Sequence, residues 1–267
     1  MKKLFNHTAL TTFTAAATLA LSLFAGAAQA KTIDKTFEVS AGGLLKLETQ
    51  LGALKIKSHN KNTVEVEVEI EGRDEDKFAV TFDNSGNNVT INGEKEDSSS
   101  NGWLGNRLRV TYHIKVPATY NLDVDTNGGS IKISDLTGKV DARTSGGSIT
   151  LGRVDGLVDI RTSGGSITVD EVTGTIKGHT SGGSVNATIS KQPTGDSKLT
   201  TSGGSITVYL AADIAVDLSA RTSGGRVSSD FEVDGSVKKK SIRGAINGGG
   251  PELVLKTSGG SVRVKKL

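Results

Sequence analysis

One glycine- and hydroxyl-rich motif in this sequence could bind phosphate. It has the form TSGGSI, and its seven copies begin at positions 126, 144, 162, 180, 201, 222 and 257. A glycine-rich loop binds phosphate when it leads into a helix and a lysine follows its last glycine. Here each copy leads into an alternating apolar pattern typical of a strand, and serine or arginine follows the glycine pair. The motif is therefore interpreted as scaffold.

Charged residues at fixed distances before the motif are the main candidates for binding chemistry. The position before the threonine holds Asp125, Arg143, Arg161, His179, Arg221 and Lys256. The position two residues earlier, on the same face, holds Asp123, Asp141, Asp159 and Lys177. Acids beside bases favour a lattice of ion pairs, each contributing about 0.2–1 kcal/mol. The alternative is a strip of cations that binds an anionic envelope or surface polysaccharide. No spacing resembles a calcium loop, so no metal site is predicted.

Three further features could take part in binding. Trp103 is the only tryptophan and stands in the polar insertion 93–107, where it could stack on a sugar or a partner, or pack back onto the fold. The basic run 238–240 with Arg243 is interpreted as a solvated rim, with docking of an acidic envelope polymer as the alternative. A third feature is a column of small polar side chains on the opposite face, most simply explained by the strand propensity of threonine. Its members are Thr150, Thr168, Asn186, Thr207 and Ser228.

Catalytic chemistry finds little support. Beyond the first thirty residues the histidines are His59, His113 and His179, which fall in different repeats. No nucleophile elbow, HExxH pattern or metal-spaced cluster occurs. The sequence therefore predicts no enzyme and no cofactor, and a polysaccharide lyase-like activity is kept as a minor alternative.

The repeat that carries these residues has the periodicity of paired strands. Successive motifs are 18, 18, 18, 21, 21 and 35 residues apart, and SIRGAI at 241–246 fits as a worn copy inside the last gap. In one period, apolar Val158 and Ile160 precede the motif and Ile167 and Val169 follow it, each alternating with polar residues. Units of this kind bury an apolar face only when stacked. The predicted fold is all-β: a single-stranded β-solenoid with 18–21 residues per coil and two flattened sheets.

The glycine pairs are expected at the corners of this solenoid. Glycine adopts positive φ at little cost, and this would explain its use where the strand reverses. The predicted corner residues are Gly128, Gly129, Gly146, Gly147, Gly164, Gly165, Gly182, Gly183, Gly203, Gly204, Gly224, Gly225, Gly259 and Gly260.

Three segments are predicted along the chain. Residues 1–30 read as a signal peptide, with Lys2 and Lys3, an apolar run and Ala28-Gln29-Ala30 before the cleavage site. Residues 31–120 form irregular coils that cap the solenoid, with strand patterns at 44–47, 64–70, 78–82, 89–91 and 108–116. Residues 121–267 form the regular solenoid.

Charge and composition narrow the location and the partners. The full chain has 32 basic and 29 acidic residues, and removing Lys2 and Lys3 leaves a net charge of +1, which argues against nucleic acid. The chain has no cysteine for a lipid anchor, and no later stretch is long enough to cross a membrane. We expect export to the periplasm, the cell surface or the medium. The oligomeric state stays open.

Taken with the motif, two stretches resemble a known family. IKVP at 114–117 and AINGGGPELVLKTSGGSVRV at 245–264 look like a bacterial adhesin-like β-solenoid family, a domain of unknown function. The resemblance implies a β-helix in the envelope or outside the cell, with no catalytic residues. The predicted function is a non-catalytic, adhesin-like interaction module. The alternative is an envelope-stress-linked sensor or structural protein that binds an envelope protein.

Overall fold

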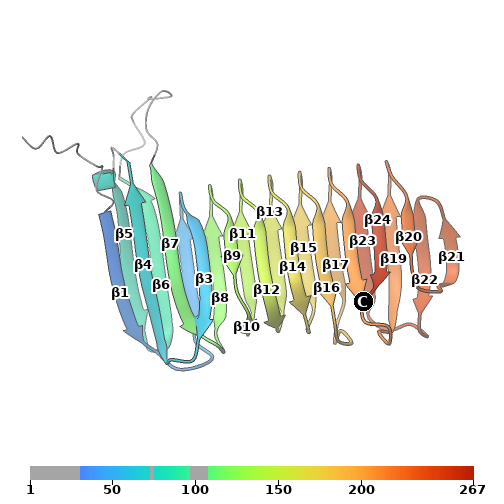
Figure 1. Cartoon of the computed structure of the whole chain (residues 1–267), viewed down its shortest axis with the longest axis horizontal. Coiled ribbons are helices and arrows are strands. Elements are labelled where there is room, and N and C mark those ends of the chain that lie inside the picture. Colours follow the sequence, from blue (N-terminus) through green and yellow to red (C-terminus); the bar gives the residue numbers. More distant parts are fainter. Residues whose placement is uncertain (1–30, 73–74, 97–107) are drawn as a thin grey trace, which may run out of the picture.

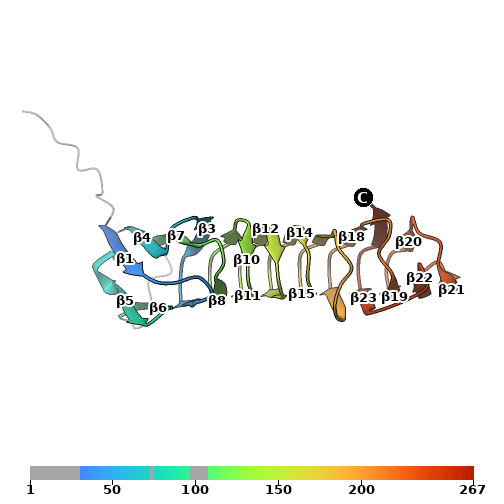
Figure 2. The ribbon, with the colours of Figure 1, turned by 90° about the horizontal axis from the view of Figure 1, so that it is seen from below.

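The computed structural model describes residues 31–72, 75–96 and 108–267. Its strands form two long sheets that face each other, as Figures 1 and 2 show from two sides. No α-helix occurs in these ranges, and one short 3-10 helix spans Glu75–Lys77. None of the described helical segments could span a membrane. The predicted signal peptide, residues 1–30, and Trp103 lie outside the described residues.

We name the two sheets A and B. In spatial order from the amino-terminal end, sheet A contains β1 (Lys31–Glu38), β4 (Thr63–Glu71), β7 (Arg109–Pro117), β3 (Ala53–His59), β9 (Ile131–Ile133), β12 (Ile149–Asp155), β14 (Ile167–Val172), β16 (Val185–Ile189), β18 (Ile206–Leu210), β24 (Val262–Lys266) and β20 (Val227–Ser229). The two-residue β10 (Leu136–Thr137) pairs with β12.

Sheet B lies behind sheet A in the view of Figure 1. From the carboxyl-terminal end it contains β21 (Asp234–Lys238), β22 (Ser241–Ile246), β19 (Val216–Thr222), β23 (Glu252–Thr257), β17 (Ser197–Thr201), β15 (Ile176–Thr180), β13 (Val158–Thr162), β11 (Val140–Thr144), β8 (Asn121–Thr126), β2 (Leu44–Thr49), β6 (Asn88–Lys95) and β5 (Phe78–Ser85). Each coil contributes one strand to each sheet, and this arrangement confirms the predicted all-β solenoid with two flattened sheets.

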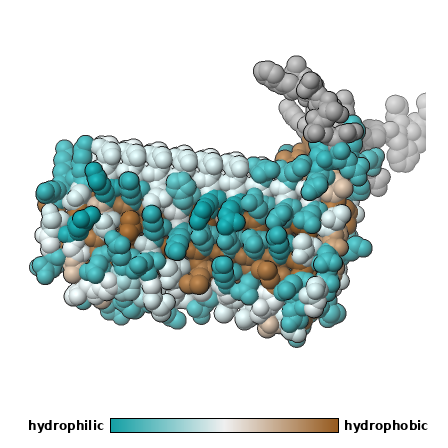
Figure 3. Space-filling view, turned by 180° about the vertical axis from the view of Figure 1, so that it is seen from behind, coloured by the Kyte–Doolittle hydropathy of each residue, from teal (hydrophilic) through white to brown (hydrophobic). Residues whose placement is uncertain are grey.

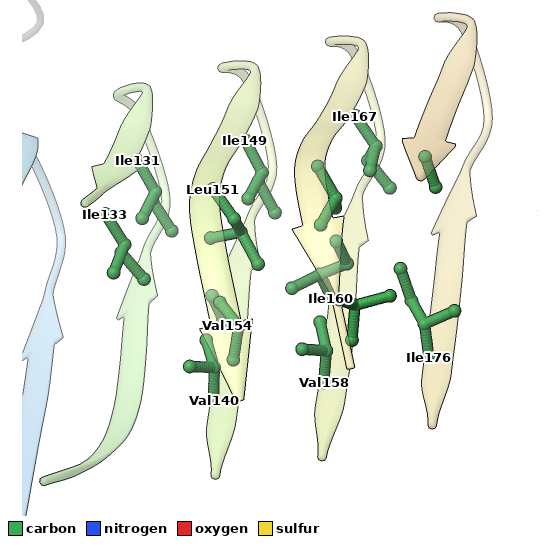
Figure 4. Packing of buried hydrophobic residues seen from close by; sticks show 14 of the residues in the cluster. Ile131, Ile133, Val140, Ile149, Leu151, Val154, Val158, Ile160, Ile167 and Ile176 are labelled. Carbon is green, nitrogen blue, oxygen red and sulfur yellow. The ribbon is translucent and has the colours of Figure 1, made fainter. Parts of the chain in front are cut away.

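The core consists of apolar ladders between the two sheets. Ile149 aligns with Ile131 on one side and Ile167 on the other, while Val140 aligns with Val158 in the opposite sheet. All of these side chains are buried, and Figure 4 shows them meeting between the sheets. Burying one such side chain contributes roughly 1.5–3 kcal/mol relative to leaving it exposed, which no single coil could obtain alone.

The order of coils in space departs from their order in sequence at both ends. Near the amino terminus, the coil β2–β3 lies between β6–β7 and β8–β9. Near the carboxyl terminus, the last coil of the chain, β23–β24, lies between β17–β18 and β19–β20. Antiparallel strands then complete each end of sheet B: β5 pairs with β6, and β22 pairs with β19 and β21. The SIRGAI segment is therefore an antiparallel capping strand, and its interpretation as a worn coil was wrong.

The glycine pairs of the TSGGSI motifs lie in bends between strands of the two sheets, and positive φ is not the reason for them. None of the glycines in the TSGGSI motifs has positive φ; those that do lie elsewhere, for example Gly138 and Gly156 in the turns between coils. Instead, successive coils approach so closely at the corner that a Cβ on Gly165 would lie within 3.0 Å of the Gly147 carbonyl group. The second glycine of the motif is required for this close approach between backbones.

The threonine and second serine of each motif hold neighbouring corners together. Thr162 Oγ1 donates a hydrogen bond to the Gly147 carbonyl oxygen of the preceding coil at 2.7 Å. The Ser166 amide donates to Ser148 Oγ at 3.1 Å, and the same two bonds recur from coil to coil. The repeated motif is thus structural, and it sets the register of the outward side chains described next.

Candidate functional site

The outer face of sheet B carries two continuous columns of side chains. The corner column, nearest the TSGGSI corner, contains in spatial order Glu48, Asp125, Arg143, Arg161, His179, Thr200, Lys256 and Arg221. The middle column, two residues earlier, contains Lys46, Asp123, Asp141, Asp159, Lys177, Lys198, Val254, Ser219 and Arg243. Figure 3 shows this face, with hydrophilic side chains in rows below a smooth pale edge formed by the corners.

The amino-terminal half of this face is largely neutralised by ion pairs within single strands. Arg143 lies 2.9 Å and 3.0 Å from the two carboxylate oxygens of Asp141, and Arg161 lies 3.1 Å from Asp159. Lys46 and Glu48 pair at 2.9 Å. Two of the predicted binding residues, Arg143 and Arg161, therefore already have carboxylate partners.

Two carboxylates of this half are partly buried, and this burial changes their pKa values. Burial raises the pKa of both Asp125 and Asp141, and the charge of Arg143 only partly opposes that effect. On Arg161, the hydrogen bond to Asp159 raises the guanidinium pKa further. Over β2, β8, β11 and β13 the two columns hold five carboxylates and three cations, so this half is slightly acidic.

The carboxyl-terminal half is different, because its part of the two columns contains no carboxylate; the nearest column acid, Asp159 on β13, aligns with Lys177 but pairs with Arg161. From β15 to β22 the columns hold Lys177, His179, Lys198, Lys256, Arg221 and Arg243, with no carboxylate among them. In the described part of the chain, none of these six side chains lies within 4.0 Å of a carboxylate oxygen. We call these six residues the basic strip.

The basic strip differs from the predicted set in two ways. Lys256 lies between Thr200 and Arg221, because β23 is inserted between β17 and β19. Lys198 and Arg243 belong to the middle column and join the predicted His179, Arg221 and Lys256. Counting three residues back from Thr201 would have identified Lys198. Arg243 faces the same side only because β22 pairs antiparallel with β19.

A shallow groove marks the start of the strip. It has a volume of about 410 Å³ and is lined by Asp159, Arg161, Lys177, Gly178, His179, Lys198 and Thr200. His179 Nδ1 lies 2.7 Å from Thr200 Oγ1, which fixes the imidazole across the boundary between two coils. The cations of adjacent coils therefore border one continuous trough.

The outer face of sheet A carries a column of polar side chains, most of which are uncharged. Its polar column runs Lys132, Thr150, Thr168, Asn186, Thr207, Arg263 and Ser228. Arg263 separates Thr207 from Ser228, so the predicted hydroxyl column is interrupted. The uncharged members of this column provide matched positions for comparison with sheet B.

A charged cluster on the amino-terminal part of sheet A was missed from the sequence. Glu65 lies 2.9 Å from Lys115 and 3.0 Å from Lys61, and their hydrogen bonds lower its pKa to about 2. Lys55 and Lys57 line a groove on this sheet together with Glu65 and Lys115. The cluster forms because β4 pairs antiparallel with β7, and no repeat in the sequence predicts that pairing.

The described residues give no support for catalysis. They contain no group of three or more His, Cys, Asp and Glu side chains able to hold a metal ion. His59 bonds to the Thr63 carbonyl oxygen, His113 lies 3.5 Å from Glu69, and His179 belongs to the basic strip, so the three imidazoles act separately.

Comparison with protein families identifies the amino-terminal part of the solenoid. A family model described as Toastrack DUF4097 matches residues 45–157. This segment resembles the Toastrack family. The Toastrack match extends from β2 through the first turns of the regular stack, and it confirms the predicted resemblance to a β-solenoid family of unknown function. A search of curated proteins found no match.

Several solved structures share a loose likeness with this chain. One is described as a "putative cell adhesion protein" from Clostridium sporogenes, with 16% identity, a TM-score of 0.41, and coverage of 90% of this chain and 100% of that one. A "putative adhesin" from Bacteroides fragilis has 13% identity, a TM-score of 0.33, and coverage of 89% and 97%. A "putative lipid binding protein" from Parabacteroides distasonis has 15% identity, a TM-score of 0.35, and coverage of 88% and 96%. Function is therefore inferred below from the surface of this chain.

Proposed function

We propose that this protein is a non-catalytic, adhesin-like interaction module of the cell envelope or cell surface, and that it binds an extended ligand across the outer face of sheet B. The observation that carries the proposal is the register of the two charged columns, which continue over nine strands from β2 to β22. A ligand that repeats along its length can meet the same kind of contact at each coil. Export to the envelope or beyond is part of the proposal.

The shape of the face supports an extended ligand. Strands of this sheet are parallel from β2 to β19, so their outward side chains form a flat lattice without a deep enclosed pocket. Small-molecule sites are concave and mostly apolar, whereas the groove on this face is shallow and lined by charged and polar residues. Binding energy on such a surface comes from many weak contacts in register.

A pair of matched substitutions tests which face binds. Thr200→Trp places a large ring at the centre of the sheet B columns, and Thr168→Trp places the same ring at the centre of the sheet A column. We expect purified wild-type protein and the Thr168→Trp variant to sediment with isolated envelope material, and the Thr200→Trp variant to sediment much less. Circular dichroism verifies that both variants fold.

The possible results separate the proposal from its rivals. Failure of the wild-type protein to bind any envelope fraction would refute the proposed function. Equal binding by both tryptophan variants would show that sheet B is not the surface used. Loss of binding after protease treatment of the envelope would favour the alternative, an envelope-stress-linked sensor or structural protein with a protein partner.

A further inference from the structure

The basic strip presents one full positive charge on each of five consecutive strands of sheet B. In spatial order these are Lys177 on β15, Lys198 on β17, Lys256 on β23, Arg221 on β19 and Arg243 on β22. Neighbouring strands in a sheet lie about 4.8 Å apart, so the five charges extend over roughly 19 Å along the solenoid axis. This regular series exists only because β23, a strand of the last coil of the chain, lies between β17 and β19 in the sheet.

These charges are available to a ligand because, among the described residues, none of the five forms an ion pair; Asp159, which aligns with Lys177, pairs with Arg161 instead. Arg143 and Arg161 on the same face have carboxylate partners within 3.1 Å. Each strand of the amino-terminal half carries its own acid, whereas from β15 onward the equivalent positions hold cations, Thr200, Ser219, Ser241 or Val254. The face therefore changes from paired charges to a single-sign field at the boundary between β13 and β15.

The strip is narrow, and its width limits the kind of partner. It is two side chains wide, which is about 7 Å measured along the strands. On one flank lie the carboxylates Asp196, Glu252 and Asp217, each two residues before a member of the middle column, and on the other lie the uncharged serine and glycine corners. A broad anionic surface such as a membrane would bring its charges against the flanking acids, while a single polymer chain would not.

The strip also lacks the features of other polyanion sites. Single-stranded nucleic acid is bound by stacking bases on aromatic side chains, and the two columns contain no Phe, Tyr or Trp, with the single imidazole of His179 as their one aromatic ring. Membrane-surface binding uses exposed apolar side chains, but the exposed large hydrophobic residues of the described chain are Leu157, Val237 and Leu267, none of which belongs to the strip.

We propose that the basic strip binds a linear acidic polysaccharide, laid along the solenoid axis with one anionic group facing each strand. This inference rests on the proposed function and specifies its ligand class and location. The charge spacing suits a polymer with one carboxylate or sulfate on each sugar. Val254 and Ser219 lie between the cations in the middle column and leave room for the sugar rings.

The test compares two triple variants that remove the same charge from the same face. One is Lys198→Gln/Lys256→Gln/Arg221→Gln in the basic strip. The other is Lys46→Gln/Arg143→Gln/Arg161→Gln in the ion-paired half. The probes are polygalacturonate, heparin as the sulfated counterpart, uncharged dextran, and phosphatidylglycerol vesicles.

We expect the wild-type protein to bind polygalacturonate or heparin but not dextran, with an affinity that decreases as salt screens the contacts. Each lost exposed contact lowers the affinity by roughly two- to five-fold, so the basic-strip variant should lose at least about tenfold. The ion-paired variant should stay within about threefold of wild type.

Equal losses in the two variants would overturn the assignment of the site, and a preference for vesicles over both polymers would overturn the ligand class. If wild type binds native envelope but neither acidic polymer, this inference fails while the proposed function stands. If wild type binds the polymers but no envelope fraction, the proposed function fails instead.

Discussion

Replacing Gly165 with alanine tests the reason for the repeated glycine pair. An alanine Cβ at this position would lie within 3.0 Å of three backbone atoms of the preceding coil, belonging to Gly147 and Ser148. Backbone cannot rotate away as a side chain can, so the corner has to separate from its neighbour. Gly165 does not have positive φ, and the expected damage is therefore due to the close approach alone.

The magnitude follows from the hydrogen bonds that join the two corners. Thr162 Oγ1 donates to the Gly147 carbonyl oxygen at 2.7 Å, the Gly164 amide donates to the Ser145 carbonyl oxygen at 3.1 Å, and the Ser166 amide donates to Ser148 Oγ at 3.1 Å. Each bond contributes about 0.5–1.5 kcal/mol, so losing two or three lowers the free energy of unfolding by about 1–4.5 kcal/mol. For a chain of this size, that corresponds to a decrease in Tm of roughly 2–18 °C.

The first glycine of another copy of the motif provides the control. A Cβ on Gly146 would be 3.8 Å from the nearest atom, the Asn127 carbonyl oxygen, and Gly146 does not have positive φ. Gly146→Ala should therefore leave Tm unchanged or raise it slightly, because alanine reduces the entropy of the unfolded chain. Thermal unfolding followed by far-ultraviolet circular dichroism measures both variants. Equal Tm values would refute the close-approach explanation.

Three further predictions address other parts of the molecule. Thr162→Val should lower the free energy of unfolding by about 1–3 kcal/mol in denaturant titrations, because the Gly147 carbonyl oxygen loses its donor, whereas Thr162→Ser should retain most of it. Burial raises the pKa of Tyr112 to about 12, so the folded state keeps a proton that the unfolded state loses above about pH 10. Stability should then fall between about pH 10 and 12, with less decrease in Tyr112→Phe, and phenolate absorbance of the native protein should confirm late ionisation. Amino-terminal sequencing of exported protein should begin at Lys31, and Met1 at that end would contradict signal-peptide cleavage.

The regular part of the fold could be predicted because its information is local and repeated. Val158 and Ile160 alternate with polar residues, and an 18-residue spacing brings Val140 beside Val158 and Arg143 beside Arg161. Once the repeat is recognised, the outward columns follow by counting from each threonine. The all-β class, the two sheets and the corner positions all depend on this one pattern.

The order of coils at the ends could not be predicted, because the repeats are too similar to specify their neighbours. The strand before one TSGGSI motif presents much the same edge as the strand before another, so β19 and β23 both fit beside β17 by local pattern. Antiparallel capping decides between them: β22 covers the free edge of β19, and β23 fills the place inside. The role of the glycine pair was missed for a related reason, since close approach between coils is a property of the stack.

The inserted last coil also connects folding with the proposed binding surface. Lys256 on β23 comes late in the chain. In space, however, β23 lies between β17, which carries Lys198, and β19, which carries Arg221. Until that coil docks, the series of positive charges has a gap at its centre. A polymer that contacts Lys198, Lys256 and Arg221 together recognises only the docked arrangement, and a ligand that binds only the folded state stabilises it in proportion to its affinity and concentration. Binding along the basic strip would therefore hold in place the coil that completes it.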